Sequence, residues 1–220
     1  YQEAHQLLTP LAEQGESQAQ LALSLLYEKG LGVTADTEQA LKWYEKAALQ
    51  GDPTVQYELG LKYFNGNNID VDYDKAATWW LKSASQEHAG AQYNLALMYI
   101  RGNGFTKNMR MALEWLNRAS LKDYAPAHYS LGVIHATGNG VQRDYTKAFE
   151  HFRIAAPAGI VEAQYNLAVC YEKGRGTPTN LERARQWYQL AAKQDFDKAK
   201  QKLAQLQSPA PANPFNKIAN

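Results

Sequence analysis

The stretch AQYNLAVCYEKGRGTPTNLERARQWYQLAAKQD, residues 163–195, is one copy of a unit that recurs along the chain every 36 residues. The copies align at three fixed columns: Ala19, Val55, Ala91, Ala127, Ala163 and Ala199; Leu23, Leu59, Leu95, Leu131, Leu167 and Leu203; Gly30, Gly66, Gly102, Gly138 and Gly174. A period between about 20 and 50 residues indicates a repeat architecture. Five full units are expected, at residues 16–51, 52–87, 88–123, 124–159 and 160–195.

Each unit is expected to contain two helices. In the quoted copy, apolar residues from Ala163 to Tyr171 recur at the spacing of an amphipathic helix. Gly174 follows and suits a left-handed helix end, because it has no side chain to clash at positive φ. The linker GRGTPTN has the glycine, proline and capping residues of a turn. A second helix with Ala184 and Trp187 on its apolar face completes the unit.

Small and large residues form columns that predict how the two helices pack. Small residues recur in the first helix at Ser24, Gly60, Ala96, Gly132 and Ala168. The large residues expected opposite them are Trp43, Trp79, Trp115, His151 and Trp187. Pairing small with large residues lets antiparallel helices interdigitate at close range.

The repeats predict an all-α solenoid of antiparallel helix pairs that forms a single domain over residues 1–207. Residues 1–15 match only the second helix of a unit, with Pro10 inside the pattern, where it could kink or fray the helix. Residues 196–207 match a lone first helix. Residues 208–220, SPAPANPFNKIAN, have three prolines and no helical period, and they read as an extended or disordered tail.

Composition excludes several classes of function. The formal net charge is +1, from 23 basic and 22 acidic residues, and no basic stripe suggests a nucleic-acid partner. No apolar run reaches the 18 or more residues of a membrane-spanning helix, so no membrane insertion is expected. The single cysteine, Cys170, excludes an intrachain disulfide framework.

The pattern AxAQYNLAxxYxxGxGxxxxxxxAxxWYxxAA resembles the Sel-1-like repeat, a close relative of the tetratricopeptide repeat with a longer inter-helix loop. The resemblance implies a right-handed superhelix whose first helices line the concave face, and a non-enzymatic role in protein binding or as a scaffold. It leaves the compartment open between periplasm and cytoplasm. Some members were reported to bind penicillin, so a hydrolase acting on β-lactam or cell-wall substrates is the alternative. The chain has no Ser-x-x-Lys and no Lys-Thr-Gly motif for that chemistry.

By the same resemblance, the middle of each first helix faces the groove that binds a partner protein or peptide. The candidate residues are Tyr57, Tyr93, Asn94, Leu97, Arg101, Tyr129, Val133, Tyr165, Asn166 and Val169. Tyrosines are frequent in binding hot spots, and an amide can both donate to and accept from a peptide backbone. Apolar residues with basic or amide edges favour a peptide with hydrophobic side chains and an acidic group. Alternatively, the tyrosine rings pack between first helices and the asparagines are solvated.

Other candidate sites have simpler structural interpretations, and neither a metal nor a cofactor is expected. His128 and His135 are seven residues apart, and His135 and His151 occupy columns of packed aromatic residues. Cys170, in an apolar helix, is expected to be a buried, inert thiol. The acidic residues Asp70, Asp72 and Asp74 are expected in a solvated loop that caps the second helix.

The tail is a further candidate for self-association. Its apolar residues, Pro214, Phe215 and Ile218, could occupy the groove of the same chain or of another copy. A tail that binds nothing is the alternative.

Overall fold

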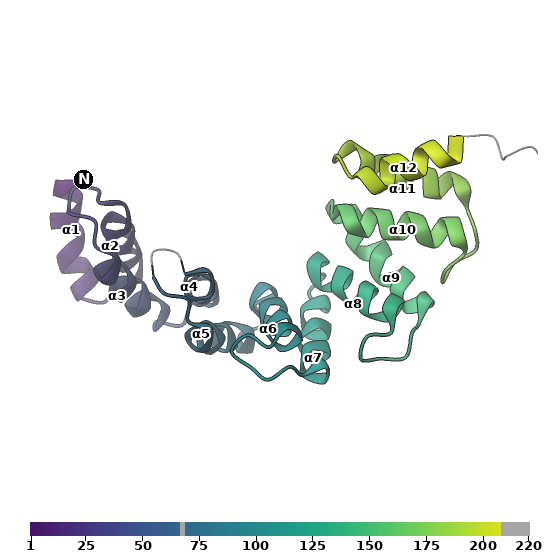
Figure 1. Cartoon of the computed structure of the whole chain (residues 1–220). Coiled ribbons are helices and arrows are strands. Elements are labelled where there is room, and N and C mark those ends of the chain that lie inside the picture. The colour runs from purple at the N-terminus through teal and green to yellow at the C-terminus, as the bar shows by residue number, and fades with distance from the viewer. Residues whose placement is uncertain (67–68, 208–220) are drawn as a thin grey trace, which may run out of the picture. The chain divides into compact units, whose positions relative to one another are not determined.

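All regular structure in the described part of the chain, residues 1–66 and 69–207 of a computed structural model, is helical (Figure 1). The chain divides into two compact units, residues 1–122 and residues from 123 onward. The first unit contains α1 (Gln2–Glu13), α2 (Ser17–Lys29), α3 (Thr37–Ala48), α4 (Pro53–Asn65), α5 (Tyr73–Ser85), α6 (Ala89–Arg101) and α7 (Met109–Ser120). The second contains α8 (Ala125–Thr137), α9 (Tyr145–Ala155), the 3₁₀ turn η1 (Ala156–Ala158), α10 (Val161–Lys173), α11 (Leu181–Lys193) and α12 (Asp197–Gln207).

This arrangement confirms the predicted all-α class and the pairing of helices. The first helices, α2, α4, α6, α8 and α10, begin at residues 17, 53, 89, 125 and 161. Helix α1 runs through Pro10 and ends at Glu13. The tail, residues 208–220, lies outside the described residues. The single domain over 1–207 and the right-handed superhelix remain predictions.

Local capping explains where the helices begin and end. Each second helix from α3 to α11 is preceded by an Asp or Asn whose side chain accepts a backbone N–H three residues later, at Asp36, Asp72, Asn108, Asp144 and Asn180. Each first helix from α2 to α10 ends at a glycine in the left-handed region, with φ between 65° and 83°. Gly102 has φ of 83° and Gly174 has φ of 65°, which confirms their predicted role as caps.

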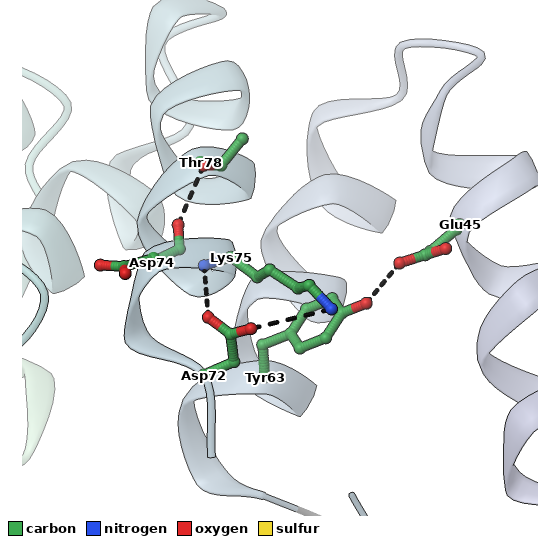
Figure 2. Close-up of polar contacts among 6 residues, drawn as sticks. All are labelled: Glu45, Tyr63, Asp72, Asp74, Lys75 and Thr78. Carbon is green, nitrogen blue, oxygen red and sulfur yellow. Dashed lines mark hydrogen bonds and ion pairs between the residues drawn. The ribbon is translucent and has the colours of Figure 1, made fainter. Parts of the chain in front are cut away.

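Figure 2 shows the capping at the start of α5 and the contacts around it. Asp72 Oδ1 accepts the backbone N–H of Lys75 at 2.9 Å, as predicted for this loop. Asp74, expected in the loop, instead lies in the first turn of α5. The Lys75 ammonium lies 5.0 Å from the centroid of the Tyr63 ring, and the Tyr63 hydroxyl donates to Glu45 on α3. These contacts join α3, α4 and α5 within the first unit.

The small residues of the first helices face large residues, but not those expected from the sequence. A Cβ added at Gly60 would collide with the ring of Trp80, and one at Gly132 would lie 2.6 Å from the ring of Phe152. The facing column is therefore one residue after the tryptophan column, because the helix turns each side chain by about 100° from the last. The tryptophans still contribute to the core: Trp43, Trp79 and Trp115 are each 8% exposed.

Paired glutamines join three of the first helices, α2, α4 and α10, to the helical segments before and after them. The buried glutamine donates to a backbone carbonyl of the preceding helix, and its amide oxygen accepts from a glutamine that follows the next helix. The three glutamine–glutamine hydrogen bonds, with the donor named first, are Gln50–Gln20 at 2.9 Å, Gln86–Gln56 at 2.9 Å and Gln194–Gln164 at 3.0 Å. Gln92 occupies the equivalent position in α6, and its Oε1 has no partner in the described part of the chain. The expected donor position holds Lys122, which pairs with Glu87 instead.

Candidate functional site

Each unit has a pocket between two consecutive first helices, over an aromatic residue of the helix between them. In the first unit the α4–α6 pocket has a volume of about 110 Å³. Its lining residues are Leu61, Phe64, Asn65, Trp80, Asn94, Leu97 and Arg101. In the second unit the α8–α10 pocket has a volume of about 250 Å³. Its lining residues are Tyr129, Val133, Ala136, Thr137, Tyr145, Phe152, Asn166, Val169, Cys170 and Arg175.

The two pockets are the same place in the repeat. Six lining residues of one correspond to six of the other, 72 residues later: Leu61 and Val133, Phe64 and Ala136, Asn65 and Thr137, Trp80 and Phe152, Asn94 and Asn166, Leu97 and Val169. The spacing of two repeats follows from the fold, because each repeat presents the same helical positions. The largest difference is Phe64 against Ala136. The smaller side chains Ala136, Phe152, Val133 and Val169 accompany the larger volume in the second unit.

Glycine in the first helix brings the aromatic floor of each pocket close to the backbone. Trp80 lies against Gly60, and its indole Nε1–H donates to the carbonyl of Tyr57 at 3.0 Å. Phe152 lies against Gly132 and is 2% exposed. Because a larger residue at either glycine would collide with the ring, these two contacts determine the depth of the pocket floors.

An asparagine lies beside the apolar surface of each pocket. Asn94 and Asn166 are both partly exposed. Neither side-chain amide makes a hydrogen bond within the part of the chain that the structure describes. Each amide therefore has both donor and acceptor capacity for a group from outside the chain.

Positive charge lies at the edge of each pocket. Arg101 lines the α4–α6 pocket from the last turn of α6. In the second unit the guanidinium of Arg175 lies 5.1 Å from the centroid of the Tyr145 ring, and that of Arg143 lies 5.5 Å from the same centroid. Among the described residues, these three arginines form no ion pair. The pocket edges are consequently available to an external anion.

Cys170 lines the α8–α10 pocket but is only 4% exposed. Burial raises the pKa of its thiol to about 11, although the nearby Arg175 acts in the opposite direction. At neutral pH the side chain is therefore a protonated thiol, which is a poor nucleophile. This matches the prediction of a buried, inert cysteine.

The structure brings seven of the ten predicted binding residues into these pockets. Asn94, Leu97 and Arg101 line the α4–α6 pocket, and Tyr129, Val133, Asn166 and Val169 line the α8–α10 pocket. Tyr57, Tyr93 and Tyr165 are partly exposed but are not among the lining residues.

Two of these tyrosines pack against the residue that precedes the next first helix. The Tyr57 ring centroid lies 4.5 Å from that of His88, and the Tyr165 centroid lies 5.3 Å from that of Phe196. His88 caps α6, and Phe196 precedes α12. These contacts support the structural alternative that the rings pack between repeats.

Three histidines of the second unit lie together. The Nδ1 atoms of His128 and His151 are 3.0 Å apart, and the rings of His135 and His151 stack with centroids 5.8 Å apart. Burial lowers the pKa of His151 to about 4, and the neighbouring His128, His135 and Lys147 add to the decrease while Glu150 opposes it. Among the residues that the structure describes, no group of three His, Cys, Asp or Glu side chains is placed to hold a metal ion.

Sequence reasoning missed Trp80, Phe152, Tyr145 and Arg175 as residues of the pockets. The first two belong to a column of large residues spaced by 36, together with Tyr44, Leu116 and Tyr188, so their periodicity was a usable signal. No comparable signal marks Arg175, because the residue two repeats earlier is Asn103.

A profile of the Sel1 repeat matches five segments of the chain, residues 15–52, 53–88, 89–124, 125–159 and 161–196. The chain belongs to the Sel1 repeat family. This confirms the resemblance found in the sequence. Sel1 repeats generally form scaffolds for protein interaction. No curated protein sequence matches the chain.

Solved structures of other Sel1 repeat proteins share the fold. A Sel1 repeat protein from Oxalobacter formigenes is 35% identical with a TM-score of 0.78, over 98% of this chain and 88% of that one. A protective antigen of uropathogenic Escherichia coli strains is 32% identical with a TM-score of 0.82, over 89% of this chain. The match spans only 42% of the antigen.

An immunity protein from Pseudomonas aeruginosa is 24% identical with a TM-score of 0.52, over 96% of this chain and 81% of that one, and shows the fold alone. In the described part of this chain, no helix is both long and apolar enough to cross a membrane.

Proposed function

We propose that this chain is a non-catalytic protein-binding module that holds a peptide segment of a partner on the first-helix face of each unit. The observation that carries the proposal is the recurrence of one pocket at the same repeat position in both units. Each pocket combines an apolar surface, an aromatic floor and an asparagine amide without a bond to the rest of the described chain. An apolar cavity with a few convergent polar groups is the usual form of a binding site.

The chemistry of the pockets supports binding rather than catalysis. The α8–α10 pocket holds one group that could act as a strong nucleophile, Cys170, and burial keeps its pKa at about 11. No carboxylate or histidine lines either pocket to act as a general base.

The proposal is tested with the full chain immobilised and a library of random twelve-residue peptides displayed on phage. Individual selected peptides are then synthesised and their dissociation constants are measured by fluorescence anisotropy. We expect the double variant Asn94→Ala/Asn166→Ala to bind at least about tenfold more weakly, because whichever unit holds the peptide then lacks the amide that bonds the peptide backbone.

The matched control is Asn117→Ala, which removes an exposed amide from the second helix α7. This variant should bind the selected peptides as the parent does. Failure to select any peptide, or equal affinity for the parent and the double variant, would overturn the proposal.

A further inference from the structure

We propose that the α8–α10 pocket receives an apolar side chain of the partner peptide, and that Arg175 binds the carboxylate of an acidic residue next to it. This inference rests on the proposed function and specifies the peptide that the second unit recognises. Two independent features support it: a phenylalanine ring that narrows the equivalent pocket of the first unit, and positive charge without an ion pair at the edge of the second.

The first unit shows what kind of group this position of the repeat accommodates. Phe64 of α4 lines the α4–α6 pocket and packs against its floor, with its ring centroid 5.1 Å from that of Trp80 and 5.2 Å from that of Tyr73. In the second unit the corresponding residue is Ala136, and the pocket is larger by about 140 Å³, the difference between 250 and 110 Å³. The α8–α10 pocket therefore has room for an apolar side chain supplied from outside.

The size and the walls of the α8–α10 pocket select the occupant. Its volume of about 250 Å³ is below the roughly 300–1,000 Å³ of clefts that hold small-molecule ligands. Val133, Ala136, Phe152 and Val169 provide apolar walls and floor. A charged side chain placed against these apolar walls would lose its hydration. A single leucine, isoleucine, methionine or phenylalanine side chain is the best match.

Charge at the pocket edge determines what lies beside that side chain. Arg175 lines the pocket, and both its guanidinium and that of Arg143 lie over the ring of Tyr145, which also lines the pocket. No acidic residue lines the pocket, and Asp144, next to Arg143 in sequence, caps α9 through the backbone N–H of Lys147. A guanidinium binds a carboxylate with two parallel hydrogen bonds, so an Asp or Glu next to the buried residue complements this edge.

Asn166 supplies the remaining contact. Asn166, on α10, lines the pocket and is partly exposed. An amide can donate to a peptide carbonyl and accept from the following N–H, which holds an extended segment in one register. The recognised motif is then an apolar residue adjacent to an acidic one, in extended conformation.

The experiment uses the peptides selected from the same library on the full chain, synthesised with blocked, amidated C-termini. We expect them to share a large apolar residue next to Asp or Glu. Ala136→Phe should weaken binding at least about tenfold, because the new ring occupies the space of the ligand side chain. The fold accommodates phenylalanine at this repeat position in α4, and circular dichroism checks that the variant is folded.

Two further variants separate the parts of the proposal. Arg175→Gln should lower the affinity for the acidic peptide by about five- to tenfold. It should leave unchanged the affinity for the same peptide with Asp replaced by Asn. Phe64→Ala opens the α4–α6 pocket and should not weaken binding to the second unit. Arg175→Lys should bind the acidic peptide more tightly than Arg175→Gln but more weakly than the parent, because an ammonium cannot form the contact with two parallel hydrogen bonds.

The outcomes distinguish this inference from the proposed function. One result would overturn the inference and leave the proposed function standing. In that result the peptides need Asn94 and Asn166, but they bind the Ala136→Phe variant as tightly as the parent. Binding that requires a free C-terminal carboxylate, or selected peptides without an acidic residue, would overturn the part assigned to Arg175. A selection that yields no peptide would overturn both.

Discussion

The change Lys122→Gln should stabilise the first unit by completing a hydrogen-bond pair that three other repeats already contain. At those three positions a glutamine donates to the amide oxygen of Gln20, Gln56 or Gln164 at 2.9–3.0 Å. The equivalent Gln92 is 4% exposed, and its Oε1 has no partner in the described chain. The backbone is already arranged for the pair. The N–H of residue 122 bonds to the carbonyl three residues earlier, as the N–H groups of residues 50, 86 and 194 do.

The size of the effect follows from the burial of Gln92. A buried acceptor without a partner costs about 1–3 kcal/mol, and a neutral hydrogen bond contributes about 0.5–1.5 kcal/mol net. The change also removes the ion pair between Lys122 and Glu87, whose side chains are 46% and 71% exposed and which therefore contributes little. We expect a net gain of about 1 kcal/mol, or roughly 2–4 °C in the melting temperature of a chain of this length.

The assay is urea unfolding followed by far-ultraviolet circular dichroism, with thermal unfolding as a second measure. The reciprocal variant Gln86→Lys is the matched comparison, because it replaces the amide donor of the intact Gln86–Gln56 pair with the side chain that leaves Gln92 unpaired at residue 122. It should lower stability by about 1–2 kcal/mol. If Lys122→Gln is neutral or destabilising while Gln86→Lys is destabilising, the reasoning about residue 122 is wrong. If both variants are neutral, the glutamine pairs do not stabilise the fold.

Three other predictions follow from individual residues. Trp115→Ala should cost about 3–5 kcal/mol because the ring is 8% exposed, and a melting temperature within a degree or two of the parent would show that this column is not core. His151 has a pKa of about 4 in the folded chain and about 6.5 in the unfolded chain, so the stability that the neutral ring contributes is present above pH 6.5 and is lost as the pH falls to 4. In thermal melts over this range His151→Gln should lose less stability than the parent, and equal losses would contradict the assignment. Gly176→Ala should be more destabilising than Gly159→Ala, because both glycines have positive φ but only at Gly176 would the new Cβ also collide with backbone atoms. Equal unfolding midpoints would contradict the close approach at Gly176.

Much of the fold and part of the site could be predicted because their causes are local in sequence. A helix cap depends on residues within one turn, so Asp72, Gly102 and Gly174 could be assigned from the repeat alone. The candidate residues Asn94 and Asn166 could be found because equivalent helical positions recur with the repeat. Both lie in pockets of the structure. The tyrosine column is less informative, since Tyr57 and Tyr165 pack against His88 and Phe196.

The sequence by itself determined the 36-residue repeat, the helix pairs, the caps and the family, because all of these are periodic properties of a single chain. Only the tertiary structure decided that Gly60 faces Trp80 and not Trp79, since one residue rotates a side chain by about 100° around the helix. It also decided that Arg175 and Arg143 meet at Tyr145, and that the pocket lined by Ala136 is larger than the one lined by Phe64. These contacts join residues from different helices and loops, and their distances depend on packing that no single repeat contains.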